Sequence, residues 1–213
     1  MYAMSIVRVS IKSDNAVEGA LRTGGKEAGV IICHPHPIYG GSMNNNVVDA
    51  IEEGFSLSGF TTLKFNFRGV GRSGGHYDEG NGEVDDLIAC WNFLKVRLND
   101  NARVILAGYS FGAWICSKAA TKINDIDAIF LVAYPFSFYE TTELKKINKK
   151  IYFVGGEHDD ISPLDSLLGF YKELPEVEKN LKVISTDHFY GGKEQEIIEF
   201  IKKMFNNDMQ FKA

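Results

Sequence analysis

The sequence predicts an α/β domain in which a mostly parallel sheet is covered by helices on both faces. Short apolar runs, typical of buried strands, alternate with longer segments whose apolar residues recur every three or four positions, as in helices. The chain has 213 residues, 45% of them hydrophobic, which is enough for one large core. No repeat, low-complexity tract or long linker interrupts the pattern. We therefore expect residues 1–213 to form a single domain.

The first half of the chain predicts three strands and two helices. Residues 4–12 alternate apolar and polar side chains, which indicates an edge strand. Residues 28–33 form a short apolar run, which suits a buried strand. Residues 44–58 place apolar side chains along one helical face, and residues 60–67 form the next apolar run. Residues 83–98 repeat apolar side chains at three- and four-residue spacing and predict the second helix.

The second half continues the alternation. Residues 103–107 read as a buried strand, and residues 111–123 as the helix that follows it. The remaining strands are expected at 128–133, 151–154 and 181–185, with helices near 163–173 and at 193–205. Strands separated by helices run parallel, and in such sheets sites form where the carboxyl ends of the strands meet.

A G-x-S-x-G motif lies between a predicted strand and a predicted helix, at residues 108–112. This context is what a nucleophile elbow requires. The glycines allow the chain to turn sharply and leave room around the serine, whose hydroxyl is then presented at the top of the sheet. Ser110 is therefore a candidate nucleophile.

Two later loops contain the base and the acid that a serine nucleophile needs. On this kind of scaffold the expected chain order is serine, then aspartate or glutamate, then histidine. One loop contains three carboxylates, Glu157, Asp159 and Asp160, and the next contains His188; each loop follows a predicted strand. The positions of these residues leave the choice among the three carboxylates open.

Four motifs together carry a family resemblance. They are H-P-H-P-x-x-G-G-x-M-x-N at 34–45, F-N-F-R-G-V-G-x-S at 65–73, G-x-S-F-G at 108–112 and D-H-F at 187–189. In combination they resemble the small lidless bacterial serine α/β-hydrolases, over roughly residues 28 to 200. The resemblance implies an α/β-hydrolase fold with no lid domain.

The resemblance also implies roles for three residues. Ser110 would be the nucleophile, His188 the general base and then the general acid, and Asp159 the carboxylate that orients the histidine. The family pattern G-x-x-D ahead of a proline fits Gly156, Asp159 and Pro163.

A serine hydrolase also needs two backbone N–H groups that stabilise the oxyanion of the tetrahedral intermediate. One would come from Phe111, at the start of a helix whose dipole favours negative charge. The other should come from the loop after strand 28–33. Pro35 and Pro37 have no N–H, so the donor is His36 or a later residue such as Ile38. We favour His36.

The substrate pocket is expected to be open. Only residues 134–150 separate strand 128–133 from the next strand, too few for a lid domain. An open site suits small or exposed acyl groups better than long lipid chains. Aromatic residues are the candidates for its walls: Tyr39, Phe111, Tyr134, Phe136 and Phe189.

Composition argues against several other classes of protein. The net charge of −5 disfavours nucleic acid or an anionic membrane as the main partner. The first residues carry no basic segment followed by an apolar one, and no apolar run approaches the length of a membrane span. Three cysteines in apolar elements, Cys33, Cys90 and Cys116, indicate reduced, buried thiols and a cytoplasmic protein. We expect no cofactor, and no metal ion because the acidic cluster at 157–160 follows no ligand spacing.

Residues 69–74 formally match the dinucleotide motif G-x-G-x-x-G. A dinucleotide site needs a helix to begin at that turn, whereas further glycines extend the loop to about Glu83. Arg68, immediately before these residues, is a candidate to anchor the loop through an ion pair with Glu83 or Asp86.

We therefore expect a serine hydrolase that cleaves small carboxylic esters through an acyl-enzyme intermediate. The sequence does not separate esters from thioesters or small amides, because all three share the same tetrahedral chemistry. The alternatives are a non-catalytic binding protein of the same fold and, less favoured, an NAD(P)-dependent oxidoreductase. The oligomeric state is left open.

Overall fold

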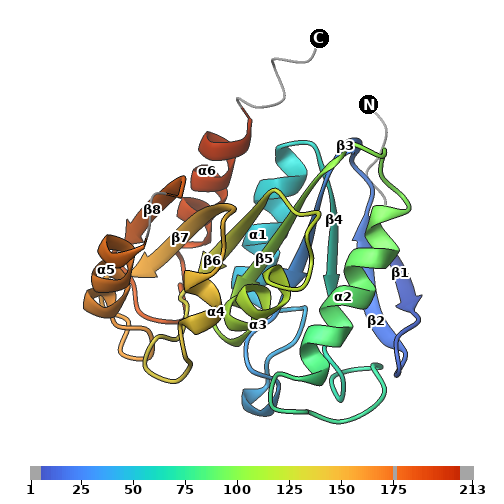
Figure 1. The fold of residues 1–213 in the computed structure, drawn as a ribbon, viewed down its shortest axis with the longest axis horizontal. Helices are drawn as coiled ribbons and strands as arrows, with labels where there is room; N and C mark the ends of the chain where they lie inside the picture. Colours follow the sequence, from blue (N-terminus) through green and yellow to red (C-terminus); the bar gives the residue numbers. More distant parts are fainter. Residues whose placement is uncertain (1–5, 175–176, 207–213) are drawn as a thin grey trace.

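The computed structural model describes residues 6–174 and 177–206, which form one sheet flanked by helices (Figure 1). The strands of the described residues are β1 Ile6–Ile11, β2 Val17–Arg22, β3 Gly25–Cys33, β4 Phe60–Phe65, β5 Arg103–Tyr109, β6 Ala128–Val132, β7 Lys150–Gly156 and β8 Lys179–Ile184. The α-helices are α1 Asn46–Leu57, α2 Gly82–Lys95, α3 Phe111–Ala120, α4 Thr142–Lys145, α5 Leu164–Glu173 and α6 Glu194–Phe205, and a short 3₁₀ helix, η1, spans Pro37–Tyr39.

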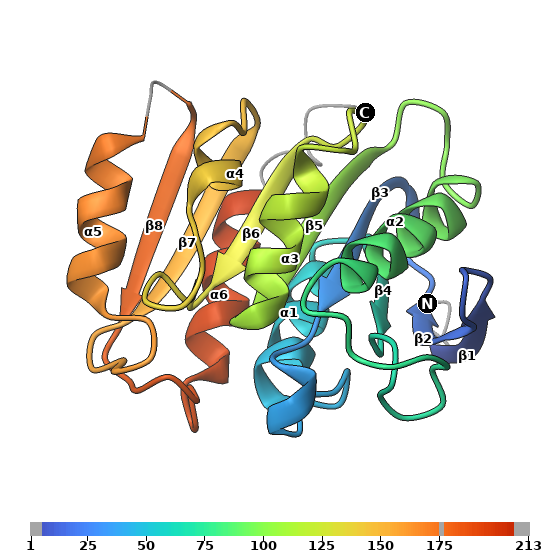
Figure 2. The same cartoon turned by 60° about the horizontal axis from the view of Figure 1, so that its bottom comes forward.

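The sheet is parallel except at one edge. Its strand order is β1-β2-β4-β3-β5-β6-β7-β8, from β1 at one edge to β8 at the other (Figure 2). The β1–β2 and β2–β4 pairs are antiparallel, and the other pairs are parallel. The carboxyl ends of β3 to β8 therefore meet along one side of the sheet. This is the α/β-hydrolase fold that the sequence predicts.

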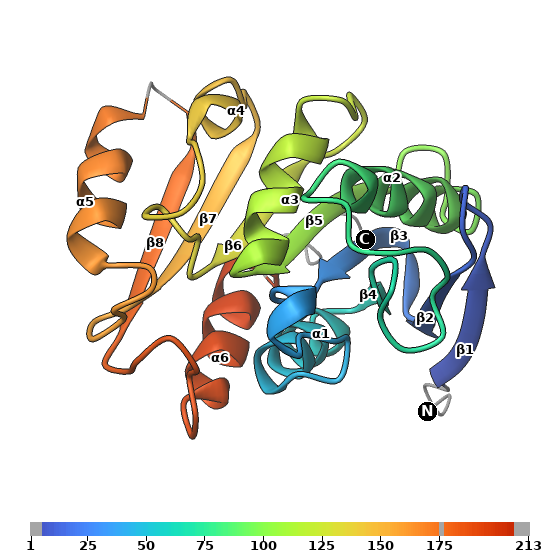
Figure 3. The same ribbon diagram turned by 90° about the horizontal axis from the view of Figure 1, so that it is seen from below.

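The helices cover both faces of the sheet. In Figure 3, α1 and α6 lie together on one face, and α2, α3 and α5 lie on the other. Successive residues of the central strands point to opposite faces, so Ile31 packs toward α2 and α3 whereas Val30 and Ile32 pack toward α1. Both faces are buried, which is why these strands are almost continuously apolar.

Among the described residues, the structure adds three elements that the sequence pattern does not predict: β2, the one-turn helix α4 and the 3₁₀ helix η1. β2 reads V-E-G-A-L-R, without the apolar alternation typical of a strand, and it is held by its two antiparallel neighbours instead. β3 also begins three residues before the predicted position because it pairs with β4 there. Residues 4 and 5 of the predicted edge strand lie outside the described residues.

Residues 69–74 do not open a helix, so the dinucleotide interpretation fails. They belong to the loop of residues 66–81 between β4 and α2. The buried carboxylate of Glu18 accepts hydrogen bonds from the Arg72 N–H and from the Asn66 amide, both at 2.9 Å. An acidic group thus occupies the inner side of the turn, and no helix N-terminus is present there to bind a phosphate.

A buried ion pair attaches this loop to α2. Arg68 donates to Asp86 through Nε at 3.1 Å and through Nη2 at 3.0 Å, and its backbone N–H donates to the same carboxylate at 2.9 Å. A Cβ atom at Gly82 would overlap the guanidinium, so any larger residue there would force the Arg68 side chain to shift away from its present position. Of the two carboxylates that the sequence suggested, Asp86 is the partner, and Glu83 accepts backbone N–H groups of the loop.

The connection between β6 and β7 contains only α4 and short turns, so the fold has no lid domain (Figure 2). Within residues 6–174 and 177–206, no helix is both long and apolar enough to cross a membrane.

Candidate active site

Ser110 lies at the sharp turn between β5 and α3. Its backbone has φ 54° and ψ −118°, a sparsely populated conformation for a residue other than glycine, typical of a strained nucleophile elbow. A Cβ atom on Gly108 would collide with the backbone of Gly112, and one on Gly112 would collide with the backbone carbonyl of Cys33. The two glycines of the motif are therefore required by close backbone approach.

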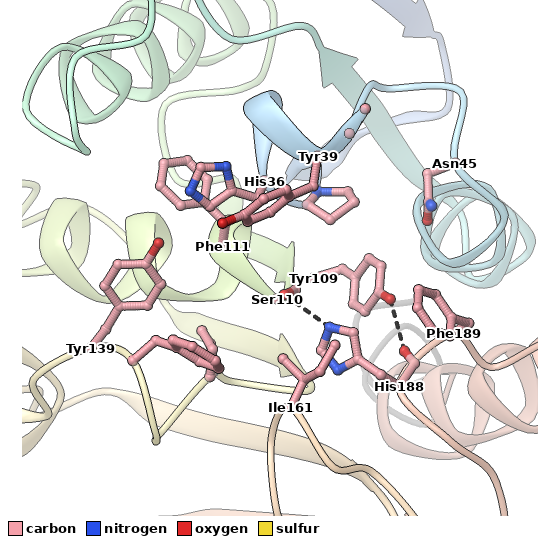
Figure 4. A pocket seen from close by; sticks show the side chains of 15 residues that line it. His36, Tyr39, Asn45, Tyr109, Ser110, Phe111, Tyr139, Ile161, His188 and Phe189 are labelled. Carbon is pink, nitrogen blue, oxygen red and sulfur yellow. Dashed lines mark hydrogen bonds between the residues drawn. The ribbon is translucent and has the colours of Figure 1, made fainter.

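The three residues expected to act together are joined by hydrogen bonds. His188 Nε2 lies 3.1 Å from Ser110 Oγ, and His188 Nδ1 lies 2.8 Å from Asp159 Oδ2 (Figure 4 draws the first pair). Asp159 accepts a hydrogen bond from Nδ1–H, so Nε2 is free to accept the Ser110 hydroxyl proton. The three side chains come from the loops after β5, β7 and β8 and are all buried.

Asp159 is the carboxylate that reaches the histidine. Its Oδ1 accepts the backbone N–H groups of Ile161 at 2.9 Å and Ser162 at 2.7 Å, which fix its orientation. Glu157 and Asp160, the other two candidates, are exposed. The turn that follows β7 thus points one carboxylate inward and the other two into solvent.

Two loop segments meet above Ser110, where an oxyanion would form. Phe111 begins α3, so its N–H has no partner within the helix. In the loop after β3, the N–H of Ile38 donates to His36 Nδ1 at 3.2 Å, and the N–H groups of Tyr39 and Gly41 donate to the His36 carbonyl. These amides are already engaged, which favours His36 over Ile38 as the second donor.

The His36 ring packs against three aromatic rings and so holds the loop in place. Its centroid lies 4.7 Å from Phe111, 4.8 Å from Tyr39 and 5.1 Å from Tyr77, whose hydroxyl is 3.3 Å from Nε2. Burial lowers the pKa of His36, so the ring is neutral near pH 7. The packing of its ring and the flanking prolines therefore both fix the position of the His36 backbone N–H.

A cleft of about 600 Å³ opens directly over Ser110 (Figure 4). Its size is typical of a small-molecule site. Three of the predicted wall residues, Tyr39, Phe111 and Phe189, line it.

The prediction that Tyr134 and Phe136 line the cleft is wrong. Tyr134 is only 2% exposed, and its hydroxyl donates to the Glu140 carbonyl at 3.0 Å. Phe136 packs against Tyr134 and Phe170 of α5. The turn after β6 reverses direction, because Ala133 has φ 48° and the N–H groups of residues 138 and 139 donate to the Pro135 carbonyl. Pro135, Phe138 and Tyr139 therefore form that wall.

A comparison with known proteins identifies the family to which this fold belongs. The sequence model of the alpha/beta hydrolase domain matches residues 27–204, which is most of the chain. The chain belongs to the alpha/beta hydrolase family.

Solved structures and one further protein are similar to most or all of the hydrolase. A solved alpha-beta serine hydrolase homologue from Coxiella burnetii is 31% identical, with a TM-score of 0.86 over 96% of this chain and 99% of that one. An α/β serine hydrolase without a lid from Xanthomonas campestris has the same TM-score at 23% identity, over 100% of this chain and 98% of that one, and shows the shared fold. An uncharacterized protein of Rickettsia prowazekii is 31% identical over 80% of this chain and 75% of its own length.

Tyr109 is a residue of the hydrolase site that the sequence interpretation missed. Its hydroxyl donates to the backbone carbonyl of His188 at 2.7 Å, and the two rings lie 5.4 Å apart. Burial raises the pKa of Tyr109 above its usual range, so the hydroxyl remains a donor. In the sequence, only its position next to Ser110 pointed to the site, because its hydrogen-bond partner, His188, lies 79 residues away along the chain.

His34 lies beneath the site, and we predict that its ring makes the stability of the hydrolase depend on pH. Its Nδ1–H donates to the Pro35 carbonyl at 2.6 Å, and its Nε2 accepts the Phe67 N–H at 3.1 Å. Burial lowers the pKa of His34 from 6.5 to about 4. Between pH 6.5 and about pH 4, His34 is therefore protonated in the unfolded chain but neutral in the folded chain. The stabilisation is complete above pH 6.5 and is lost as the pH falls toward 4.

From pH 8 to pH 5 this histidine should remove about 2 kcal/mol from the free energy of unfolding. Urea unfolding at the two pH values measures it for the wild type and for His34→Gln, which has no titrating ring. The loss between pH 8 and pH 5 should be about 2 kcal/mol smaller in the variant. An equal loss in both proteins would contradict the assignment.

Proposed function

We propose that this protein is a serine esterase that hydrolyses small carboxylic esters through an acyl-enzyme intermediate. The observation that carries the proposal is the continuous set of hydrogen bonds from Ser110 Oγ to His188 and from His188 to Asp159, at the floor of an open cleft. The strained conformation of Ser110 and the close approach of the loop after β3 support the same conclusion.

In the proposed acylation step, Ser110 Oγ attacks the ester carbonyl carbon while its proton passes to His188 Nε2. The carbonyl oxygen becomes an oxyanion that accepts hydrogen bonds from the N–H groups of His36 and Phe111. Asp159 stabilises the imidazolium that has formed. The carbon–oxygen bond to the alcohol then breaks, the alcohol leaves with the proton from Nε2, and the acyl group stays on Ser110.

Deacylation repeats the sequence with water. His188 removes a proton from the water as its oxygen attacks the acyl carbon, and the proton then returns to Ser110 Oγ as the carboxylic acid leaves. Thioesters and small amides would follow the same steps. A cytoplasmic location belongs to the same proposal, since the three cysteines are free and buried, as suits a reducing compartment.

A covalent probe tests this function. The wild type should hydrolyse p-nitrophenyl butyrate, and a fluorophosphonate should abolish the activity by forming one adduct, which mass spectrometry of the digested protein should find on the peptide containing Ser110. All three cysteines are buried, and burial raises the pKa of the thiols of Cys33 and Cys90, so the cysteines should stay unlabelled. An intact protein that takes up no probe and cleaves no ester would instead be a binding protein with a hydrolase fold.

A further inference from the structure

The two ends of the cleft over Ser110 differ in chemistry. In Figure 4, Tyr139 lies on one side of Ser110, Asn45 and Phe189 lie on the other, and Ile161 is drawn between them, next to His188. We call the first side the apolar end, formed by Pro135, Phe138, Tyr139 and Ile161 from the loops after β6 and β7. We call the second the polar end, formed by Gly40, Gly41, Asn45 and Phe189.

The apolar end is held in shape before any substrate binds. The Tyr139 ring stacks on Trp114 of α3, with centroids 4.0 Å apart and planes at 13°. The backbone N–H groups of Phe138 and Tyr139 both donate to the Pro135 carbonyl, at 3.0 and 3.2 Å. Phe138 nevertheless remains 68% exposed at the edge of the cleft. Together with Pro135, Tyr139 and Ile161, this exposed aromatic side chain gives the cleft a continuous apolar wall that a bound apolar group would cover.

The cleft also offers no partner for a charged acyl group. Among the described residues that line it, none is a lysine, an arginine, an aspartate or a glutamate. A carboxylate or phosphate placed there would lose hydration without gaining an ion pair, which is costly. The group that binds at this end should therefore be uncharged.

The position of His188 indicates which part of the ester lies at each end. The leaving alcohol must be near His188 Nε2, which supplies its proton. The chain continues from His188 into Phe189, whose carbonyl accepts a hydrogen bond from Asn46 of α1 at 3.0 Å, so this segment is attached to the polar end. The alcohol, which leaves with a polar hydroxyl, fits that end. The acyl group then extends the opposite way.

We propose that the apolar end is the acyl site and that it selects uncharged acyl groups of medium length, aliphatic or aromatic, with Phe138 as a specificity-determining residue. This inference rests on the proposed esterase function. It extends the expectation of small esters toward longer acyl groups, because a cleft of about 600 Å³ with an exposed aromatic edge has room for more than an acetyl group.

A series of p-nitrophenyl esters tests it, because the leaving group stays constant while the acyl chain changes from acetate to butyrate to hexanoate. A fully buried methylene contributes up to about fourfold in binding, so at partial burial kcat/KM should rise about tenfold from acetate to hexanoate. Phe138→Ala should lower kcat/KM for hexanoate by about fivefold and for acetate by less than about twofold.

Phe189→Ala is the matched control, since it removes the same side chain, 64% exposed, from the other end of the cleft. It should change kcat/KM by the same factor for every acyl length. A second comparison uses the p-nitrophenyl monoester of adipic acid, which has the same carbon number as the hexanoate and a terminal carboxylate. Its kcat/KM should be at least about tenfold lower.

Two failures would be distinguishable. If no ester is cleaved faster by the wild type than by Ser110→Ala, the esterase function is wrong, and the inference falls with it. If cleavage depends on Ser110 but kcat/KM is flat along the acyl series, or if Phe138→Ala and Phe189→Ala give the same profile, the esterase function stands and the acyl-site assignment is overturned.

Discussion

Replacing Ser110 by alanine should lower kcat for p-nitrophenyl butyrate by about 10⁴-fold or more, with the fold intact. The variant loses the only atom that forms the acyl intermediate. The N–H groups above the site and the cleft itself remain and should leave a small residual rate. Initial rates at saturating substrate, corrected for uncatalysed hydrolysis, measure the effect.

Two further variants make this result specific. His188→Ala should cost about as much as Ser110→Ala, and the double variant should be no slower than either, because the two residues act as one unit. Ser185→Ala serves as the control, since Ser185 is an exposed serine on the loop that leads to His188, and its hydroxyl lies 3.4 Å from Nε2 of the exposed His158. Wild-type rates in Ser110→Ala would refute the nucleophile, whereas losses that multiply in the double variant would refute the proton transfer between the two residues.

Replacing Asp86 by alanine should lower the free energy of unfolding by about 3–5 kcal/mol. Asp86→Ala leaves the guanidinium of Arg68, whose side chain is 10% exposed, with no carboxylate at 3.0 Å and also removes the acceptor of the Arg68 N–H. An unpaired buried charge costs far more than the ion pair contributes. The expected fall in Tm is roughly 10 °C for a domain of this size.

Urea unfolding followed by circular dichroism measures this change. The control is Asp85→Ala, one residue earlier on α2, where the side chain is exposed. Asp85→Ala should lower the free energy of unfolding by less than about 1 kcal/mol, which is what a carboxylate near a helix N-terminus contributes. If the two variants lose equal stability, the Arg68–Asp86 pair does not anchor the loop of residues 66–81.

The order and type of most elements follow from local pattern. The strand–turn–helix around Ser110 is predicted within a few residues because apolar runs, glycine spacing and helical periodicity are all local properties. β2 escapes prediction for the opposite reason: its residues have little preference for a strand, and its pairing partners, residues 6–11 and 62–65, supply the structure.

Residues of the site divide in the same way. Ser110 and His188 stand out in the chain because their chemistry is rare outside such motifs. The family pattern selects Asp159 from its neighbours, and the structure places this residue beside His188. The aromatic residues after β6 are different, because four of them lie within residues 134–139 and each is equally suited to a core or to a cleft.

The sequence by itself determined the family, the parallel α/β order and the three residues joined by hydrogen bonds at the site. Only the tertiary structure decided which side chains face the cleft. The positive φ of Ala133 and the hydrogen bonds to the Pro135 carbonyl turn Tyr134 into the core and Phe136 against it, and they leave Phe138 and Tyr139 at the cleft. This backbone reversal sets the direction of the side chains in the loop after β6. The reversal depends on α3 and α5, which pack against the loop, and not on the residues of the loop alone.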